Sequence, residues 1–190
     1  MEENNKLYFF DKVLAKTLIP FIPKSVKPNH ITVLRFLTTP LVAYLLWKES
    51  YLIGLISFVL VAFTDALDGA LARVRNQITD WGKVYDPLAD KILIGLVVYI
   101  IVLRYIDIYA ALIIIGLEML ITATAFIRKR RGEIVQANVW GKIKMVLQVF
   151  GVVVLLLAIA FDVEGFLPFS AGVFYLAIAF GIVSLLSYGI

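Results

Sequence analysis

Four aspartates fall within residues 65–90 of a strongly apolar chain: Asp65, Asp68, Asp86 and Asp90. Hydrophobic residues make up 62% of the sequence and charged residues 17%. Apolar runs border the aspartates on both sides, which places them at helix ends that dip into a bilayer. A charged side chain there costs about 2.5–3.5 kcal/mol on insertion scales. These carboxylates therefore indicate a cationic partner among them.

The spacing of the aspartates favours a shared ligand. Asp65 and Asp68 lie on one face of a predicted helix, and Asp86 and Asp90 lie on one face of the next, each pair about 5–6 Å apart. The same two faces carry residues too small to block a ligand: Gly69, Ala72 and Gly82. An all-oxygen pocket suits Mg²⁺, Mn²⁺ or Ca²⁺ and not zinc or copper. Structural charge pairing is the alternative interpretation.

Pro87 complicates the second of these helices. Proline pushes the residue before it toward an extended conformation, and it is common at the first helical position. The sequence therefore predicts either a kink at Asp86 or a helix that begins there. In the second case Asp86 would lie at a helix N-terminus, where negative charge is favourable.

The composition bounds the class of protein. A length of 190 residues and a mean hydropathy of +0.93 predict one integral membrane domain, with no room for a soluble one. The absence of cysteine excludes disulfides, thiolate metal sites and a catalytic thiol. The first residues lack a basic segment that leads into an apolar core, so we expect no cleaved signal peptide. His30, the one histidine, has no His or Cys near it, so we expect no metal or catalytic role for it.

Hydropathy predicts an all-α integral membrane protein with six transmembrane helices of about 17–25 residues. The expected spans are Ile31–Trp47, Tyr51–Arg73, Val84–Leu103, Ile108–Ile127, Ile143–Phe161 and Phe166–Tyr188. Before them, Asn5–Ile19 has an apolar face and three lysines, which predicts an amphipathic helix lying in the membrane interface. That face consists of Leu7, Phe10, Leu14 and Leu18. A short solvent-facing helix is the alternative, and the expected division is 1–27 for the juxtamembrane segment and 28–190 for the six-helix domain.

Basic residues predict the orientation. Of 18 Lys and Arg residues, only Lys48 and Arg104 lie on one side of the predicted spans. By the positive-inside rule, both termini and the aspartates face the cytoplasm from the cell membrane. The basic face should attract anionic lipid head groups. Nucleic acid is not an expected partner, because no basic stripe is joined to a recognition fold.

The pattern Asp-x2-Asp-Gly-x2-Ala-Arg-x8-Gly-x3-Asp-x3-Asp resembles the signature of the CDP-alcohol phosphatidyltransferase family. Every fixed position is matched, by Asp65, Asp68, Gly69, Ala72, Arg73, Gly82, Asp86 and Asp90. The resemblance covers the chain from about Pro28 to its end. It implies an enzyme that splits the phosphoanhydride of a CDP-linked lipid such as CDP-diacylglycerol, releases CMP and passes the phosphatidyl group to a hydroxyl. It also implies a homodimer.

The resemblance assigns roles to these residues. The aspartates at 65, 68, 86 and 90 would hold two divalent cations, Mg²⁺ or Mn²⁺, and Asp90 would be the catalytic base. The residues expected to bind the CDP-lipid are Asn29, Thr32, Asp68, Gly69, Ala72, Arg73 and Gly82. Arg73 suits paired hydrogen bonds to phosphate. Pro28-Asn29-His30-Ile31-Thr32 resembles the family's entry to the first span, although Asn29 as a helix N-cap is the alternative.

Three further charged residues leave alternatives open. Arg35 and Lys91 either extend their head groups to the membrane surface or balance the aspartates. Glu118 lies in the middle of a predicted span, which marks a functional candidate by default. A hydrogen bond between helices explains Glu118 equally well.

The acceptor is predicted from two stretches, 86–91 and 140–144, which resemble the phosphatidylglycerophosphate synthase branch of the family. Its acceptor is glycerol 3-phosphate, whose phosphate the basic side chains of Arg128, Lys142 and Lys144 would bind. A plain charge run is the alternative for 128–131. Leu117 and Ala125 stand where that branch tends to carry arginine. Phosphatidylglycerol, as in cardiolipin synthesis, and inositol phosphate therefore stay open as acceptors.

A transporter that carries protons or cations is the alternative from another class. It would need polar groups along a whole transmembrane path and related halves of the chain. The outer half of every predicted span is apolar, and the last two spans have no charge between Lys144 and Asp162 or after Glu164. The polar groups open to one side only, which favours the transferase.

Overall fold

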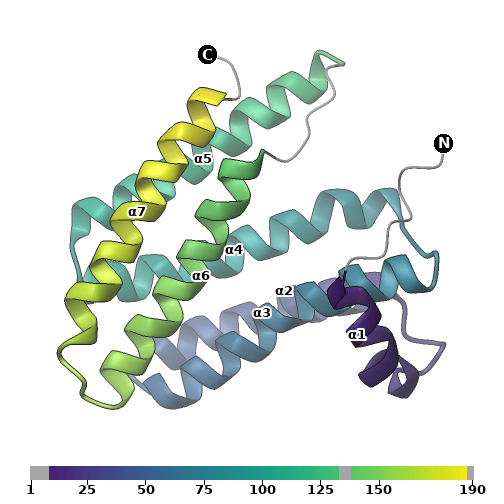
Figure 1. The fold of residues 1–190 in the computed structure, drawn as a ribbon, viewed down its shortest axis with the longest axis horizontal. Helices are drawn as coiled ribbons and strands as arrows, with labels where there is room; N and C mark the ends of the chain where they lie inside the picture. The colour runs from purple at the N-terminus through teal and green to yellow at the C-terminus, as the bar shows by residue number, and fades with distance from the viewer. Residues whose placement is uncertain (1–8, 133–137, 188–190) are drawn as a thin grey trace. The chain divides into compact units, whose positions relative to one another are not determined.

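The computed structural model describes residues 9–132 and 138–187, and its secondary structure in these ranges is helical. Figure 1 shows the order of the elements. They are α1 (Phe9–Thr17), the 3₁₀-helix η2 (Ile19–Phe21), α2 (Pro28–Trp47), α3 (Tyr51–Val74), α4 (Asp80–Tyr105), α5 (Ile108–Arg130), α6 (Val139–Ala160) and α7 (Phe166–Ser187). The predicted all-α class is confirmed. Tyr188, the predicted end of the last span, lies outside the described residues.

Five of the described helices are long and apolar enough to cross a membrane: α2, α3, α5, α6 and α7. These five agree with an integral membrane protein. Helix α4 is not among them, because charged side chains crowd its first half, from Asp80 to Lys91. The sixth predicted span is therefore present as a helix, but it carries too many charged side chains to be grouped with the other five.

The chain divides into two compact units, which we describe separately. The first consists of Met1–Val42 and Ile56–Leu93, and the second of Ala43–Leu55 and Ile94–Ile190. All of the aspartates predicted to hold metal belong to the first unit, whereas Arg128, Lys142 and Lys144 belong to the second.

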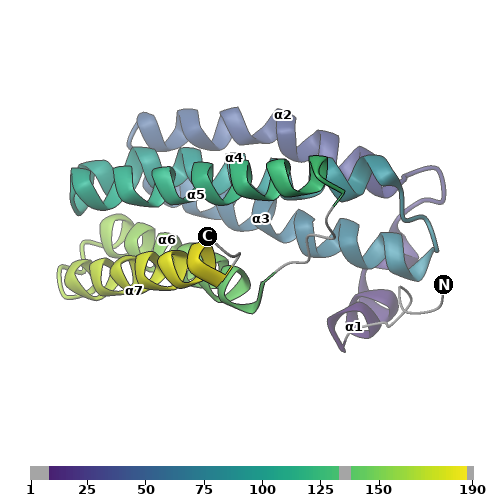
Figure 2. The same cartoon turned by 90° about the horizontal axis from the view of Figure 1, so that it is seen from above.

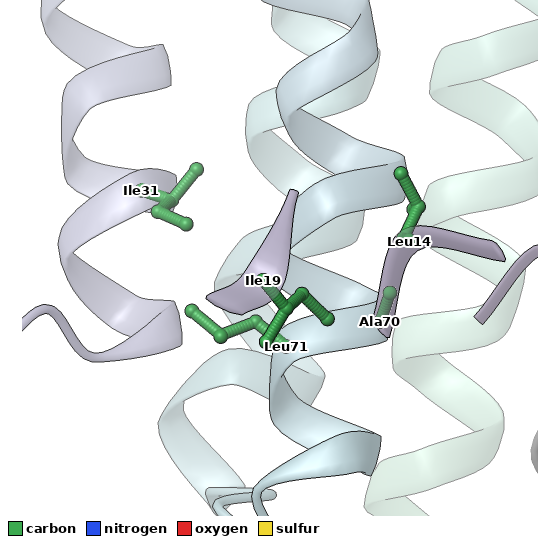
Figure 3. Close-up of a cluster of buried hydrophobic side chains, with 5 residues drawn as sticks. All are labelled: Leu14, Ile19, Ile31, Ala70 and Leu71. Atoms are coloured by element: carbon green, nitrogen blue, oxygen red, sulfur yellow. The ribbon is translucent and has the colours of Figure 1, made fainter. Parts of the chain in front are cut away.

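A small hydrophobic core joins the N-terminal elements of the first unit. It consists of Leu14, Ile19, Ile31, Ala70 and Leu71, from α1, η2, α2 and α3 (Figure 3). Burying a large aliphatic side chain contributes about 1.5–3 kcal/mol. These contacts therefore hold α1 and η2 against the C-terminal end of α3.

The packing divides the apolar face that was predicted for the N-terminal amphipathic helix. Leu14, which was assigned to that face, is buried in the core of the first unit. Phe10 and Leu18 of the same predicted face stay exposed, Phe10 by 73%. The remaining member, Leu7, lies outside the described residues. Helix α1 thus packs on protein along one side and exposes apolar and basic side chains elsewhere.

Helix α4 begins at Asp80, so the predicted helix start at Asp86 is wrong. Thr79 caps this helix, because its hydroxyl accepts a hydrogen bond from the Gly82 N–H at 2.9 Å. Pro87 lies inside the helix. Proline has no backbone N–H, so one hydrogen bond of the helix is missing at this position.

The second unit is a helical bundle in which α6 and α7 pack along each other, as Figures 1 and 2 both show. Gly151 of α6 permits a close approach, because a Cβ atom there would lie 3.1 Å from the ring of Phe174. Helix α6 begins where Asn138 accepts a hydrogen bond from the Trp140 N–H at 3.0 Å. Helix α5 also contacts α7.

Candidate active site

Three helices of the first unit meet at the hydroxyl of Thr32. This hydroxyl lies 2.7 Å from Asp86 Oδ1 and 3.3 Å from Asp68 Oδ2. Thr32 is fully buried on α2, Asp68 is buried on α3, and Asp86 is half-buried on α4. A hydroxyl has one hydrogen to donate, so the closer oxygen, that of Asp86, receives the stronger bond. Because both carboxylates contact one atom, their nearest oxygens are no more than about 6 Å apart.

Arg35 is the cation that the sequence predicted among the aspartates. Its guanidinium donates to Asp65 Oδ1 at 2.9 Å and to Asp68 Oδ2 at 2.7 Å, and its Nε donates to the Thr64 hydroxyl at 3.2 Å. The Arg35 side chain is fully buried. Of the two roles left open for Arg35, charge balance is therefore the correct one. We call Thr32, Arg35, Asp65, Asp68 and Asp86 the aspartate cluster.

Gly82 leaves the space in which polar side chains converge on Asp86. A Cβ atom at this position would lie 3.1 Å from Asp86 Oδ2, 3.2 Å from the Thr79 hydroxyl and 3.5 Å from Asn29 Oδ1. Asn29 Oδ1 also accepts a hydrogen bond from Thr79 at 2.9 Å. Since α2 begins at Pro28, Asn29 lies inside the helix, and its prediction as an N-cap is wrong. It instead ties α2 to the start of α4.

Arg73 and Gly69 lie together on α3, one turn apart. A Cβ atom at Gly69 would lie 3.3 Å from both Nη atoms of Arg73, so glycine gives the guanidinium room to lie across the helix. Two N–H groups of Arg73 donate to the carboxylate of Asp11 on α1, each at 2.8 Å. Ala72 is half-buried on the same helix. The structure thus places Gly69 beside Arg73, and it shows Asp11 as a further partner that the sequence did not predict.

Sequence analysis missed Asp11, Thr64 and Thr79 in this region. Asp11 carried one usable signal, since it lies three residues before Leu14, on the same side of α1. An acidic residue beside an apolar face often has a buried partner. Thr79 carried a helix N-cap signal, because threonine is a favoured N-cap residue and stands directly before Asp80.

The aspartates do not form a metal cage in this structure. Within residues 9–132 and 138–187, no group of three or more His, Cys, Asp or Glu side chains is arranged to hold a metal ion. The donor chemistry nevertheless fits a hard cation, because every candidate ligand is a carboxylate oxygen. Asp68 and Asp86 both contact the Thr32 hydroxyl, so two of these carboxylates already lie near each other. Asp90, the predicted base, is buried on α4, one turn after Asp86.

The predicted acceptor residues lie in the second unit and differ from one another. Lys144 is buried and forms an ion pair with Glu118 of α5, to which Gln148 also donates a hydrogen bond at 3.2 Å. The inter-helix bond predicted for Glu118 is therefore present. Lys142 is exposed, because residues two apart leave a helix on opposite sides. Arg128 is half-buried near the end of α5.

The all-helical fold, the membrane-length helices and the motif aspartates define a membrane enzyme class, and comparison with known proteins identifies it. The sequence pattern of the CDP-alcohol phosphatidyltransferase family matches residues 25–183. The chain belongs to this family and is a phosphatidyltransferase. Members of the family generally depend on divalent metal ions.

Several curated relatives carry one name, CDP-diacylglycerol--glycerol-3-phosphate 3-phosphatidyltransferase. The protein of Bacillus subtilis (strain 168) is 32% identical over 174 residues, which cover 83% of this chain and 90% of the relative. That of Rickettsia typhi is 31% identical over 134 residues, covering 68% of this chain and 75% of the relative. That of Mycoplasma pneumoniae is 25% identical over 188 residues, covering 84% and 83%.

Proposed function

We propose that this protein transfers the phosphatidyl group of CDP-diacylglycerol to the hydroxyl of glycerol 3-phosphate and releases CMP. The observation that carries the proposal is the aspartate cluster, in which motif residues of α3 and α4 meet Thr32 of α2. The donor is the substrate class of the family. The acceptor is the one that the names of the relatives give, and the Bacillus subtilis and Rickettsia typhi proteins each share more than 30% identity with this chain.

The membrane arrangement is part of the same proposal. Helix α4 has 26 residues, which gives it a length of about 39 Å at 1.5 Å per residue. We propose that its charged first half lies at the cytoplasmic surface and that its apolar remainder makes α4 the sixth span, with α2, α3, α5, α6 and α7. Both termini would then lie in the cytoplasm. Residues 1–27 would form a juxtamembrane segment, 28–190 the enzymatic domain, and two copies a homodimer.

The donor would bind at the first unit. We assign its nucleotide and diphosphate to Asn29, Thr32, Asp68, Gly69, Ala72, Arg73 and Gly82. Gly69 leaves room for the Arg73 guanidinium, and Gly82 leaves room for Asp86, Thr79 and Asn29. Arg73 brings positive charge near this region, which favours a phosphate group.

The four aspartates would hold two divalent cations, Mg²⁺ or Mn²⁺. Bound cations would neutralise the charge that builds up on the diphosphate when its bridging bond breaks. Arg35 supports this arrangement, because it keeps Asp65 and Asp68 together on one side of the cluster. Thr32 has the matching role between Asp68 and Asp86.

Asp90 would act as the base. In the proposed reaction the acceptor hydroxyl attacks the phosphorus that carries the lipid, and its proton passes to the Asp90 carboxylate. The bond from that phosphorus to the bridging oxygen breaks, and CMP leaves with the bridging oxygen. Burial of Asp90 keeps bulk water from competing with the acceptor.

We assign the acceptor phosphate to Arg128, Lys142 and Lys144, because their positive charge would attract it. To bind the acceptor phosphate, the Lys144 ammonium would either leave its ion pair with Glu118 or contact both groups at once. Phosphatidylglycerol and inositol phosphate stay the alternative acceptors, because one position of the bundle carries no cation. Leu117, which stands where an arginine would favour glycerol phosphate, packs so close to α7 that a Cβ atom on Gly181 would lie 3.0 Å from it.

An acceptor panel tests the proposal. The purified protein in lipid nanodiscs is incubated with CDP-diacylglycerol and, separately, glycerol 3-phosphate, phosphatidylglycerol, inositol phosphate or serine. CMP release is measured, and we expect it with glycerol 3-phosphate. Release with phosphatidylglycerol or inositol phosphate alone would transfer the assignment to that acceptor. An inert protein with all of them would contradict the proposed reaction.

A further inference from the structure

Asp11 of α1 binds one edge of the Arg73 guanidinium through two hydrogen bonds. Its two carboxylate oxygens accept hydrogen bonds from Nε and Nη2, each at 2.8 Å. Asp11 is only 2% exposed, whereas the Arg73 side chain is 30% exposed. A two-point bond between arginine and a carboxylate is among the strongest and most directional polar contacts in proteins. The pair therefore fixes the plane of the guanidinium as well as its position.

Gly69 constrains the same guanidinium from a second direction. A side chain at residue 69 would begin 3.3 Å from both Nη atoms, so the group lies against the bare backbone of α3. Gly69 and Arg73 both belong to the motif, but Asp11 does not. Asp11 thus acts on a motif residue from a helix outside the motif.

Packing brings Asp11 to this place. Leu14 and Ile19, which follow Asp11 in the chain, are buried against Ala70 and Leu71 of α3 (Figure 3). A released α1 would expose this core to solvent or lipid. The contact between Asp11 and Arg73 therefore belongs to a fixed part of the first unit.

Arg75, two residues after Arg73, fastens the segment that follows α1. Its guanidinium donates to the backbone carbonyl oxygens of Ile22 at 2.6 Å, Val26 at 3.0 Å and Pro23 at 3.2 Å. These bonds hold the connection between η2 and α2 at the end of α3. Because this connection is held at several points, we expect α1 to stay bound to α3 throughout the reaction.

We infer that Asp11 is a positioning residue for CDP-lipid binding, which holds Arg73 in the orientation that meets the lipid's phosphate. This inference rests on the proposed function, because it takes the CDP-lipid as the ligand of Arg73. It makes α1 part of the donor site. The alternative is that Asp11 occupies the site of the substrate phosphate and must leave before the substrate binds. Burial of the neighbouring Leu14 and Ile19 against α3 disfavours this alternative.

The test is the affinity of the full-length protein for CDP-diacylglycerol, measured in nanodiscs without any acceptor. Asp11→Asn keeps the shape of the side chain and removes its charge. We expect its Kd to rise at least about tenfold, while the KM for glycerol 3-phosphate stays within about twofold of the wild type. Asp11→Glu, which retains the carboxylate, should recover part of the affinity. With Arg73→Lys already present, Asp11→Asn should add little further loss.

Leu14→Ala is the control for a merely structural role. It weakens the packing of α1 and should lower the melting temperature, with a smaller change in Kd than Asp11→Asn at a temperature where both variants are folded. An equal change in both variants would overturn the inference. An unchanged Kd for Asp11→Asn would overturn it too, and tighter binding would show that Asp11 competes with the substrate. A wild-type protein that binds no CDP-diacylglycerol would instead overturn the proposed function.

Discussion

The hydroxyl of Thr32 donates a hydrogen bond to Asp86 Oδ1 at 2.7 Å, and this contact joins α2 to α4. The hydroxyl oxygen of Thr32 also lies 3.3 Å from Asp68 Oδ2 on α3. One side chain thus sets the separation of two carboxylates that stand on different helices. Arg35, three residues later on α2, bonds Asp68 and Asp65. Helix α2, which precedes the family motif in the chain, therefore organises the motif's carboxylates.

Removing the Thr32 hydroxyl should impair turnover without unfolding the protein. Thr32→Val keeps the volume and loses the bonds to Asp86 and Asp68, a change worth about 1–3 kcal/mol. We expect kcat with CDP-diacylglycerol and glycerol 3-phosphate to fall about 5- to 150-fold. Thr38→Val is the matched control on α2, because the Thr38 hydroxyl bonds only backbone carbonyls of its own helix. Equal rates in the two variants would remove Thr32 from the site.

Removing the Arg35 charge should destabilise the protein. Arg35→Gln leaves Asp65 and Asp68 without their buried partner, which typically costs about 3–5 kcal/mol. The unfolding temperature of this variant in detergent should be clearly lower than that of the wild type. Added Mg²⁺ should restore more stability to it than to the wild type, since a cation can replace the lost charge.

The exposed pair of Lys83 and Asp80 supplies the control for Arg35. Lys83→Gln breaks an ion pair whose two side chains are mostly in solvent, and such pairs contribute about 0–1 kcal/mol. We expect almost no change in its unfolding temperature. An Arg35→Gln protein as stable as Lys83→Gln would contradict the role of Arg35 in balancing the aspartates.

Alanine at Gly82 should disturb Asp86. Its Cβ atom would lie 3.1 Å from Asp86 Oδ2, so the carboxylate or Thr79 must move. We expect Gly82→Ala to lower kcat/KM for CDP-diacylglycerol by about tenfold or more, because small displacements at a reacting centre are costly. Gly95→Ala on the same helix meets no atom within 4 Å and should leave the rate unchanged. The prediction fails if both variants behave alike.

Asp90→Asn separates binding from turnover. It keeps the shape of the side chain and removes the proposed proton acceptor, so CMP release should stop while the Kd for CDP-diacylglycerol stays near that of the wild type. Excess chelator should also stop CMP release in the wild type, and Mg²⁺ or Mn²⁺ should restore it. Near-normal turnover of Asp90→Asn would assign the base to another residue.

The two lysines of α6 should behave differently. Lys142 is exposed, so Lys142→Ala should raise the KM for glycerol 3-phosphate at least about tenfold without loss of stability. Lys144→Ala should raise this KM to a similar degree and also lower the unfolding temperature, because Glu118 loses its charged partner. Glu118→Gln serves as the control for the ion pair alone. If neither lysine affects the KM, Lys144 serves only its ion pair with Glu118 and the exposed Lys142 is a surface charge.

The sequence predicted the helices and the shared face of Asp65 and Asp68, because both depend on local patterns, but it left the role of Arg35 open. Hydropathy marks a long apolar helix, and the spacing of Asp65 and Asp68 places both on one face, where Arg35 then pairs with them. The pairing of Asp11 with Arg73 joins residues far apart in the chain, and no local period encodes it. The burial of Lys144 against Glu118 likewise depends on how α5 and α6 are rotated about their axes, which hydropathy leaves undetermined.

Transfer of a labelled acceptor into lipid tests the central claim most directly. Radiolabelled glycerol 3-phosphate is incubated with the nanodisc-bound protein, with and without CDP-diacylglycerol, and the organic phase is counted. We predict that label enters the lipid phase only when CDP-diacylglycerol is present, in a one-to-one ratio with released CMP, and that Asp90→Asn gives only background. Label that stays in the aqueous phase while CMP is released, or no CMP release at all, would contradict phosphatidyl transfer to glycerol 3-phosphate.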